Sequence, residues 1–179
     1  MDASGSLRSD RRTVLTGIAT SLGIATLGGC TGTFAGDGET ADDTSQEVHP
    51  EHETTDVQVT DSEGDVSGEV MAAIADTSDL QRTGLSETDE LPPDRGMLFV
   101  YDEMQELTFT MPDMDFAIDI IFADADRTIT SIYRARAPGP DEDGSEQVYF
   151  DTGQYVLEVV YEWTAEHGVQ TGDVLEFEL

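Results

Sequence analysis

Short apolar runs alternate with turn-forming residues from about residue 69 to the end of the chain. Runs of this length, bounded by Gly, Pro and Asp, are typical of β-strands joined by turns rather than of long helices. The pattern predicts strands at 69–74, 97–101, 107–111, 118–122, 128–133, 154–160 and 174–179. The acidic turn at 123–127 joins two of these strands, so we expect a β-hairpin there.

Two short helices interrupt the strands. Thr77 or Ser78 is placed to cap the first helix, which continues through residue 82 and ends at Gly84. Residues 161–167 are expected to form one or two further helical turns. The predicted fold class is therefore mainly β (α+β): a small antiparallel β-sandwich or barrel with one or two short helices.

The amino-terminal residues 1–29 have the pattern of an export signal. Arg11 and Arg12 precede a weakly apolar stretch, 13–27, that is too short to span a bilayer. Paired arginines before such a stretch indicate the twin-arginine export machinery. We therefore expect the protein to be exported.

The single cysteine, Cys30, directly follows Leu27, Gly28 and Gly29. Small residues before a cysteine at the end of a signal resemble a lipobox, in which the thiol is lipidated. The alternative is a lone free or buried cysteine in an amino-terminal helix. We favour lipidation, with the membrane as partner through lipid on Cys30, the protein facing the outside of the cell.

Residues 30–68 are rich in Gly, Thr, Ser, Asp and Glu and contain few large apolar side chains. Such a segment buries too little surface to offset its ordering entropy, so we expect a disordered acidic tether. Residues 69–179 are expected to form one globular domain.

Acidic residues dominate the charge of the chain. It has 39 Asp and Glu, eight arginines and no lysine, for a net charge of −31. This balance argues against nucleic-acid binding, because phosphate contacts require basic patches. Acids spread through most loops favour adaptation to strong brine, where salt screens the repulsion. A surface for a cationic partner is the alternative and would predict a localised acidic patch.

Several sequence blocks occur in an order that resembles one known family. These blocks are Gly84-Leu85, Arg95–Val100, Phe109-Thr110-Met111, Ile118–Asp124, Gly153–Val159, Trp163, His167-Gly168-Val169 and Gly172-Asp173. Over residues 70–179 the chain is similar to the domain of unknown function 192. The resemblance implies a small antiparallel β-sandwich or barrel and no established reaction. Many relatives carry Phe-Trp-Met-Lys-Asn-Thr in the central block, whereas this chain has Pro112 and Asp113 in place of the Lys and Asn.

Four residues are candidates for a binding site: Arg95, Met111, Asp119 and Trp163. Asp119 lies within an apolar strand, where a carboxylate is costly unless it is paired. Asp119 is a pocket acid in one interpretation. In a second, it is a structural group paired with a turn backbone or with Arg95. In a third, its face of the strand is exposed to solvent. Arg95 has the geometry to clamp a carboxylate ligand or to satisfy a neighbouring acid.

The sequence leaves two functional hypotheses. The first is a binding or accessory module at the cell surface of a halophile, without cofactor or metal. The alternative is a small hydrolase or metal-dependent enzyme in which Asp119 and His167 act as acid and base. An enzyme would require these two side chains to converge in one pocket.

Overall fold

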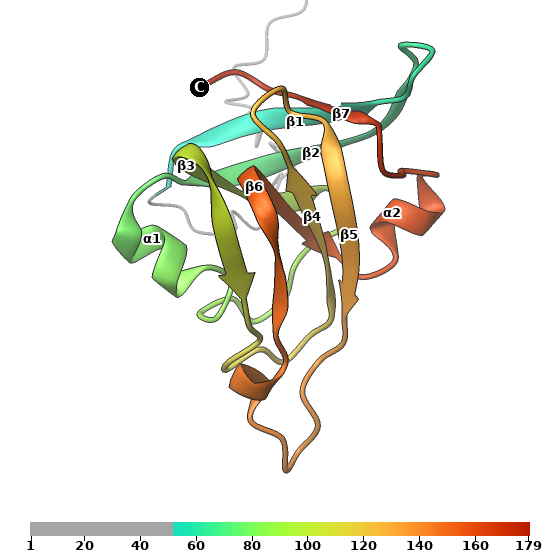
Figure 1. Ribbon diagram of the computed structural model, residues 1–179. Coiled ribbons are helices and arrows are strands. Elements are labelled where there is room, and N and C mark those ends of the chain that lie inside the picture. Colours follow the sequence, from blue (N-terminus) through green and yellow to red (C-terminus); the bar gives the residue numbers. More distant parts are fainter. Residues whose placement is uncertain (1–51) are drawn as a thin grey trace, which may run out of the picture. The chain divides into compact units, whose positions relative to one another are not determined.

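The computed structural model describes residues 52–179, so the predictions for Arg11, Arg12 and Cys30 lie outside the described residues. The strands are β1 (Thr54–Thr60), β2 (Val66–Ala75), β3 (Arg95–Phe109), β4 (Ile118–Ala123), β5 (Ile129–Ala135), β6 (Tyr149–Val160) and β7 (Val174–Glu176). Two α-helices, α1 (Ser78–Thr83) and α2 (Trp163–Glu166), and the 3-10 helix η1 (Gly144–Glu146) complete the domain. The predicted mainly β fold with short helices is confirmed (Figure 1).

The strands form one sheet in the order β5-β4-β6-β3-β2-β1-β7. Neighbouring strands are antiparallel except for β2 and β3, which are parallel. The sheet curls so that its two edges approach each other, because Thr128, just before β5, forms a β-bridge with Val174 of β7. The backbone N–H of Leu175 also donates to the carbonyl of Arg127 at 2.9 Å. The curled sheet therefore approaches a barrel.

The domain begins earlier than the sequence predicted. β1 lies within the segment expected to be a disordered tether, and it pairs with both β2 and β7. Its Val57 and Val59 are fully buried and alternate with polar residues. The prediction of disorder across 54–68 was wrong. The two buried valines and the β-branched threonines of this segment favour a strand, and β2 and β7 provide hydrogen-bonding partners on both sides of it.

β3 is one long strand where the sequence predicted two. It pairs with β6 from Gly96 to Phe109, with an irregular register between Val100 and Gln105. The intervening residues 102–106 are exposed and, apart from Met104, polar. These side chains interrupt the apolar pattern without interrupting the backbone pairing, which is why the pattern indicated a break.

The two faces of the sheet bury separate groups of apolar side chains. One face carries Val57, Leu98, Ile121, Leu157 and Leu175, together with side chains from both edge strands. The other face carries Met97, Phe99, Ile120, Phe122 and Val156. β4 contributes to both, and all six of its residues are buried. Strand alternation places Asp119 with the first group and Glu158 with the second.

The first helix follows the capping pattern predicted for it. The Thr77 hydroxyl accepts a hydrogen bond from the Leu80 N–H at 3.4 Å. Gly84, with φ of 51°, ends the helix and donates its N–H to the Leu80 carbonyl. α1 and α2 lie at opposite sides of the domain (Figure 1). Across residues 52–179, none of the helices has the length and apolar character needed to cross a membrane.

Candidate functional site

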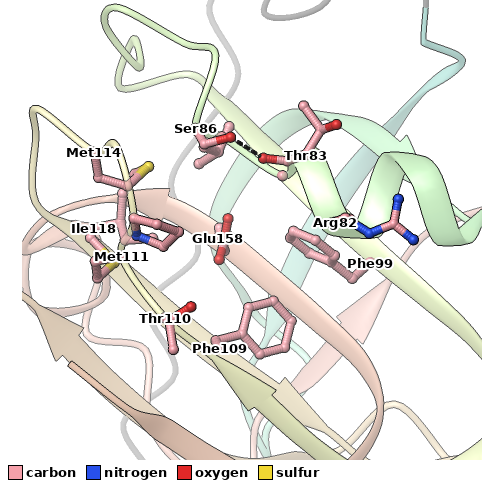
Figure 2. Close-up of a pocket in the computed structure, with 13 residues that line it drawn as sticks. Arg82, Thr83, Ser86, Phe99, Phe109, Thr110, Met111, Met114, Ile118 and Glu158 are labelled. Carbon is pink, nitrogen blue, oxygen red and sulfur yellow. Dashed lines mark hydrogen bonds between the residues drawn. The ribbon is translucent and has the colours of Figure 1, made fainter. Parts of the chain in front are cut away.

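A small cavity opens between the end of α1 and the loop that follows β3 (Figure 2). Its volume is about 80 Å³. The side chains that line it include Phe99, Phe109, Met111, Met114, Ile118 and Glu158. We refer to it as the Glu158 pocket, because that residue supplies the carboxyl group that reaches it.

Glu158 lies near the carboxyl end of β6, opposite Met97 of β3 and Ile120 of β4. Its side chain is only 5% exposed. Within the described part of the chain, its carboxyl group receives no hydrogen bond and forms no ion pair, and its oxygens keep some exposure at the cavity. Burial alone raises the pKa of Glu158 to about 8, because the low-dielectric surroundings disfavour the charged form.

The remaining wall of the pocket is mixed, because Thr83, Ser86 and Thr110 line it together with aromatic and thioether side chains. The rings of Phe99 and Phe109 meet edge to face, with centroids 4.9 Å apart. Met111 and Met114 are buried on the opposite side of the carboxyl group (Figure 2). The pocket therefore presents one carboxyl group among two aromatic rings, two thioethers and three hydroxyl-bearing side chains.

Two other ionisable side chains lie near Glu158. Arg82 lines the pocket, but its side chain is largely exposed and forms an ion pair with Asp79 at 2.9 Å. Tyr101, on β3, is half-buried. Burial and then the negative charge of Glu158 raise the pKa of Tyr101 to about 12, so it stays neutral near neutral pH.

A close backbone contact holds the methionine side of the pocket. The Met111 N–H donates to the carbonyl of Gly144 at 3.0 Å. A Cβ atom on Gly144 would lie 1.8 Å from the Met111 carbonyl oxygen. Glycine is therefore required at this position for the acidic loop before β6 to pack against the loop after β3.

Asp119 is fully buried and has three hydrogen-bond donors. Its carboxylate accepts from the N–H of Glu162 at 3.1 Å, from the N–H of Thr164 at 3.0 Å and from the Thr164 hydroxyl at 2.5 Å. Glu162 has φ of 67°, an uncommon conformation for a residue with a side chain. Asp119 thus stabilises the turn that begins α2, which corresponds to the structural alternative among the sequence hypotheses.

Trp163 and His167 pack together on α2. Their rings are stacked with centroids 4.4 Å apart, and the His167 Nδ1 hydrogen bonds with the Trp163 carbonyl at 2.8 Å. Trp163 is buried, and its ring covers Gly68, where a Cβ atom would approach to 2.7 Å. Both side chains have structural partners in the fold.

The structure separates the candidate residues that the sequence grouped. Arg95 forms an ion pair with Asp94 at 2.8 Å, at the start of β3. Of the four binding candidates, Met111 lines the Glu158 pocket, whereas Arg95, Asp119 and Trp163 do not. No group of three or more metal-ligating side chains occurs between residues 52 and 179.

Glu158 was not among the candidate residues from the sequence. The signal was present, because Glu158 interrupts the apolar run 155–160 as Asp119 interrupts the run 118–122. The rule that singled out Asp119 applies equally to Glu158. A search for every acid inside an apolar strand would have found both residues.

Comparisons with known proteins agree with this architecture. The family model for DUF192, described as an uncharacterized ACR, matches residues 58–177. The chain belongs to this family. Among the curated proteins, none matches the sequence.

Two solved structures share the fold. One is a proposed transcription regulator from Sinorhizobium meliloti 1021, with 25% identity and a TM-score of 0.64 over 70% of this chain and 95% of that one. The other is a protein of unknown function from Novosphingobium aromaticivorans DSM 12444, with 30% identity and a TM-score of 0.60 over 72% of this chain and 90% of that one. This DUF192 domain is therefore similar to bacterial proteins along nearly their whole length.

Proposed function

We propose that this DUF192 protein is a lipid-anchored binding module on the outer face of the membrane, with the Glu158 pocket as its ligand site. The observation that carries the proposal is Glu158, a residue that is only 5% exposed and whose carboxyl group reaches a cavity and has no partner within residues 52–179. Burying such a group without a hydrogen bond is unfavourable by a few kcal/mol. A ligand that supplies the missing partner accounts for an acid at this position.

The enzyme alternative finds less support in the geometry. The Asp119 carboxylate accepts three hydrogen bonds from the α2 turn, and the His167 ring is held by Trp163. Each group has its own structural partner, whereas an acid and base pair needs both side chains directed at one substrate. Binding at Glu158 requires no rearrangement of either residue.

A role in gene regulation, as proposed for the Sinorhizobium relative, is disfavoured by charge. Residues 52–179 contain 31 acidic side chains and five arginines. A surface of this charge repels the phosphate backbone at low salt. We therefore base the proposal on the pocket and on the amino-terminal sequence.

The proposed location rests on the sequence before the domain. Arg11, Arg12 and the Leu27–Cys30 block support export followed by lipidation, and the acidic segment after Cys30 supports display away from the bilayer. Two acyl chains at Cys30 are needed for stable anchoring, because one chain gives only marginal binding.

Substitution of the cysteine tests the anchor. Cys30→Ser removes the thiol that forms the thioether, so we expect the protein to leave the membrane fraction after a carbonate wash. Thr31→Ala keeps the cysteine and serves as the matched control, which should stay with the membrane. Retention of Cys30→Ser in washed membranes would refute lipid anchoring.

Methionine methyl NMR tests the pocket. The full chain carrying Cys30→Ser is labelled at its methionine methyl groups and titrated in molar KCl with methylammonium, acetate and methanol. Met111 and Met114 report on the pocket, whereas Met71 and Met104 are exposed elsewhere and act as internal controls. We expect one of these probes to shift the pocket methyls selectively. If all three leave the pocket methyls unchanged, the assignment of the pocket as the ligand site is wrong.

A further inference from the structure

We infer that the Glu158 pocket binds a primary ammonium group, with the Glu158 carboxylate as its counter-ion and the Phe99 and Phe109 rings beside it. This inference rests on the proposed binding function and specifies the chemical class of the ligand. The charge, the lining and the size of the pocket each support it.

Charge selects a cation. When Glu158 is ionised, its carboxylate repels an anionic ligand. An anion could therefore bind only while Glu158 is protonated. Arg82, the other charged side chain that lines the pocket, is already paired with Asp79. A cationic ligand supplies the opposite charge that Glu158 does not receive from residues of the described domain.

The lining selects an organic cation over a metal ion. Ca²⁺ takes six to eight oxygen ligands and Mg²⁺ requires about six, whereas this pocket offers one carboxyl group and no cluster of further acidic or imidazole ligands. The faces of Phe99 and Phe109 attract an ammonium group through their quadrupoles, at about 0.5–2 kcal/mol per favourable contact. The thioethers of Met111 and Met114 provide polarizable apolar surface for the attached carbon chain.

Size restricts how much of the ligand enters. A cavity of about 80 Å³ holds a few atoms. An amine at the end of a chain, as in an alkylamine or a lysine side chain, fits with its ammonium group inside and its chain directed to solvent. A nucleotide or a sugar ring is too large to reach Glu158.

Binding is coupled to proton release. Before the ligand binds, Glu158 is mostly protonated at pH 7, because burial raises its pKa to about 8. The ammonium group binds the carboxylate form, so the proton leaves Glu158 for solvent while the amine keeps its own. Of the ionisable groups nearest the carboxyl, Arg82 on α1 is paired with Asp79, and Tyr101 on β3 stays neutral between pH 7 and 9 because its pKa is raised to about 12. β4 contributes apolar residues to this face.

Methylammonium is the probe for the experiment, and methanol is its neutral counterpart of equal heavy-atom count. Both are titrated into the full chain carrying Cys30→Ser in buffered molar KCl, and the methyl signals of Met111 and Met114 are followed. We expect methylammonium to bind about tenfold more tightly at pH 9 than at pH 7, because the ionised fraction of Glu158 rises from about one tenth to nine tenths. Methanol should bind weakly and without this pH dependence.

Two variants separate the pocket from general charge effects. Glu158→Gln keeps the shape of the side chain and should abolish both the selective shifts and the pH dependence. Glu103→Gln removes one negative charge from an exposed position on β3 and should change neither. The methyl signal of Met97, which is fully buried, confirms that each variant is folded.

The outcomes distinguish the two proposals. Selective binding of acetate or methanol in place of methylammonium would overturn the ammonium assignment and leave the binding function in place. Methylammonium binding that is independent of pH, or unchanged in Glu158→Gln, would also overturn it. Pocket methyls that respond to none of the three probes would overturn both proposals.

Discussion

Two acids in apolar strands, Asp119 and Glu158, have opposite environments in this domain. Asp119 is fully buried and accepts three hydrogen bonds from the turn before α2 and from Thr164. Glu158 is nearly as buried, yet its carboxyl group lacks a partner anywhere in residues 52–179 and its pKa is raised to about 8. The first acid stabilises the fold, whereas the second destabilises it whenever it is ionised. This difference is why the ligand site is assigned to Glu158.

Glu158 makes a defined contribution to the pH dependence of stability. Its pKa rises on folding from an ordinary value of 4.5 to about 8, so the folded state binds the proton more tightly than the unfolded state. The resulting stabilisation is fully present below pH 4.5 and is lost as the pH rises through about 8. Glu158→Gln is uncharged at every pH. The free energy of unfolding of the wild type relative to this variant should therefore fall by a few kcal/mol between pH 5 and 9.

Denaturant unfolding in molar KCl measures this difference at each pH. Other titrating groups contribute equally to both proteins and cancel in the comparison. The same comparison with Glu103→Gln should be nearly independent of pH, because solvent surrounds that carboxylate before and after unfolding. A constant difference for Glu158→Gln across this range would show that the Glu158 carboxyl is not buried as the structure describes.

The sequence identifies both acids as unusual but cannot distinguish them. Each interrupts an apolar strand, and the donors that satisfy Asp119 lie 43 and 45 residues further along the chain. Nothing in the residues next to Asp119 indicates those donors. The presence or absence of a distant backbone N–H decides which acid is structural, and that depends on how the sheet curls.

At the level of elements, the accuracy of the sequence prediction followed how local the stabilising contacts are. The α1 cap at Thr77 and the hairpin of β4 and β5 depend on residues close together in the chain, and both were predicted. β1 is an exception, because it forms a hairpin with the neighbouring β2 as well as pairing with the distant β7; it was missed because only Val57 and Val59 give it an apolar pattern. The pocket was missed because its walls come from residues far apart in the chain, in α1, β3, β4, β6 and the loops after α1 and β3.

Gly144 is the position at which the acidic loop before β6 packs against the loop after β3. Gly144→Ala places a Cβ atom 1.8 Å from the Met111 carbonyl oxygen, so one loop must move. We expect a destabilisation of about 1–3 kcal/mol, as for other overpacked sites, and altered methyl signals for Met111. Gly139→Ala, in the same acidic loop, is the matched control, because its Cβ would make ordinary contacts with Glu142 at 3.7 Å and beyond. Equal effects of the two substitutions on stability would contradict the proposed contact.

At the level of the whole molecule, charge and fold act against each other. The described domain packs 31 acidic residues and five arginines onto a small curled sheet. Its ion pairs are few and local, such as Arg136 with Glu142 at 2.6 Å. Repulsion among the remaining carboxylates weakens the compact state unless salt screens it. The same negative surface charge raises the local concentration of cations near the protein, which favours the ammonium ligand inferred for the pocket.

The domain should therefore be more stable in brine than in dilute buffer. The Debye length shortens from about 10 Å at 0.1 M salt to about 3 Å at 1 M, so most repulsion between surface carboxylates disappears. We expect the melting temperature to rise steadily with KCl from millimolar to molar concentration. Replacing Asp102, Glu103 and Glu106, an exposed group on β3, by their amides should raise the melting temperature in dilute buffer and reduce its dependence on KCl. An equal concentration of sucrose, which is uncharged, controls for exclusion of solutes from the protein surface. A melting temperature that is unchanged from millimolar to molar KCl would show that the acidic surface is not an adaptation to salt.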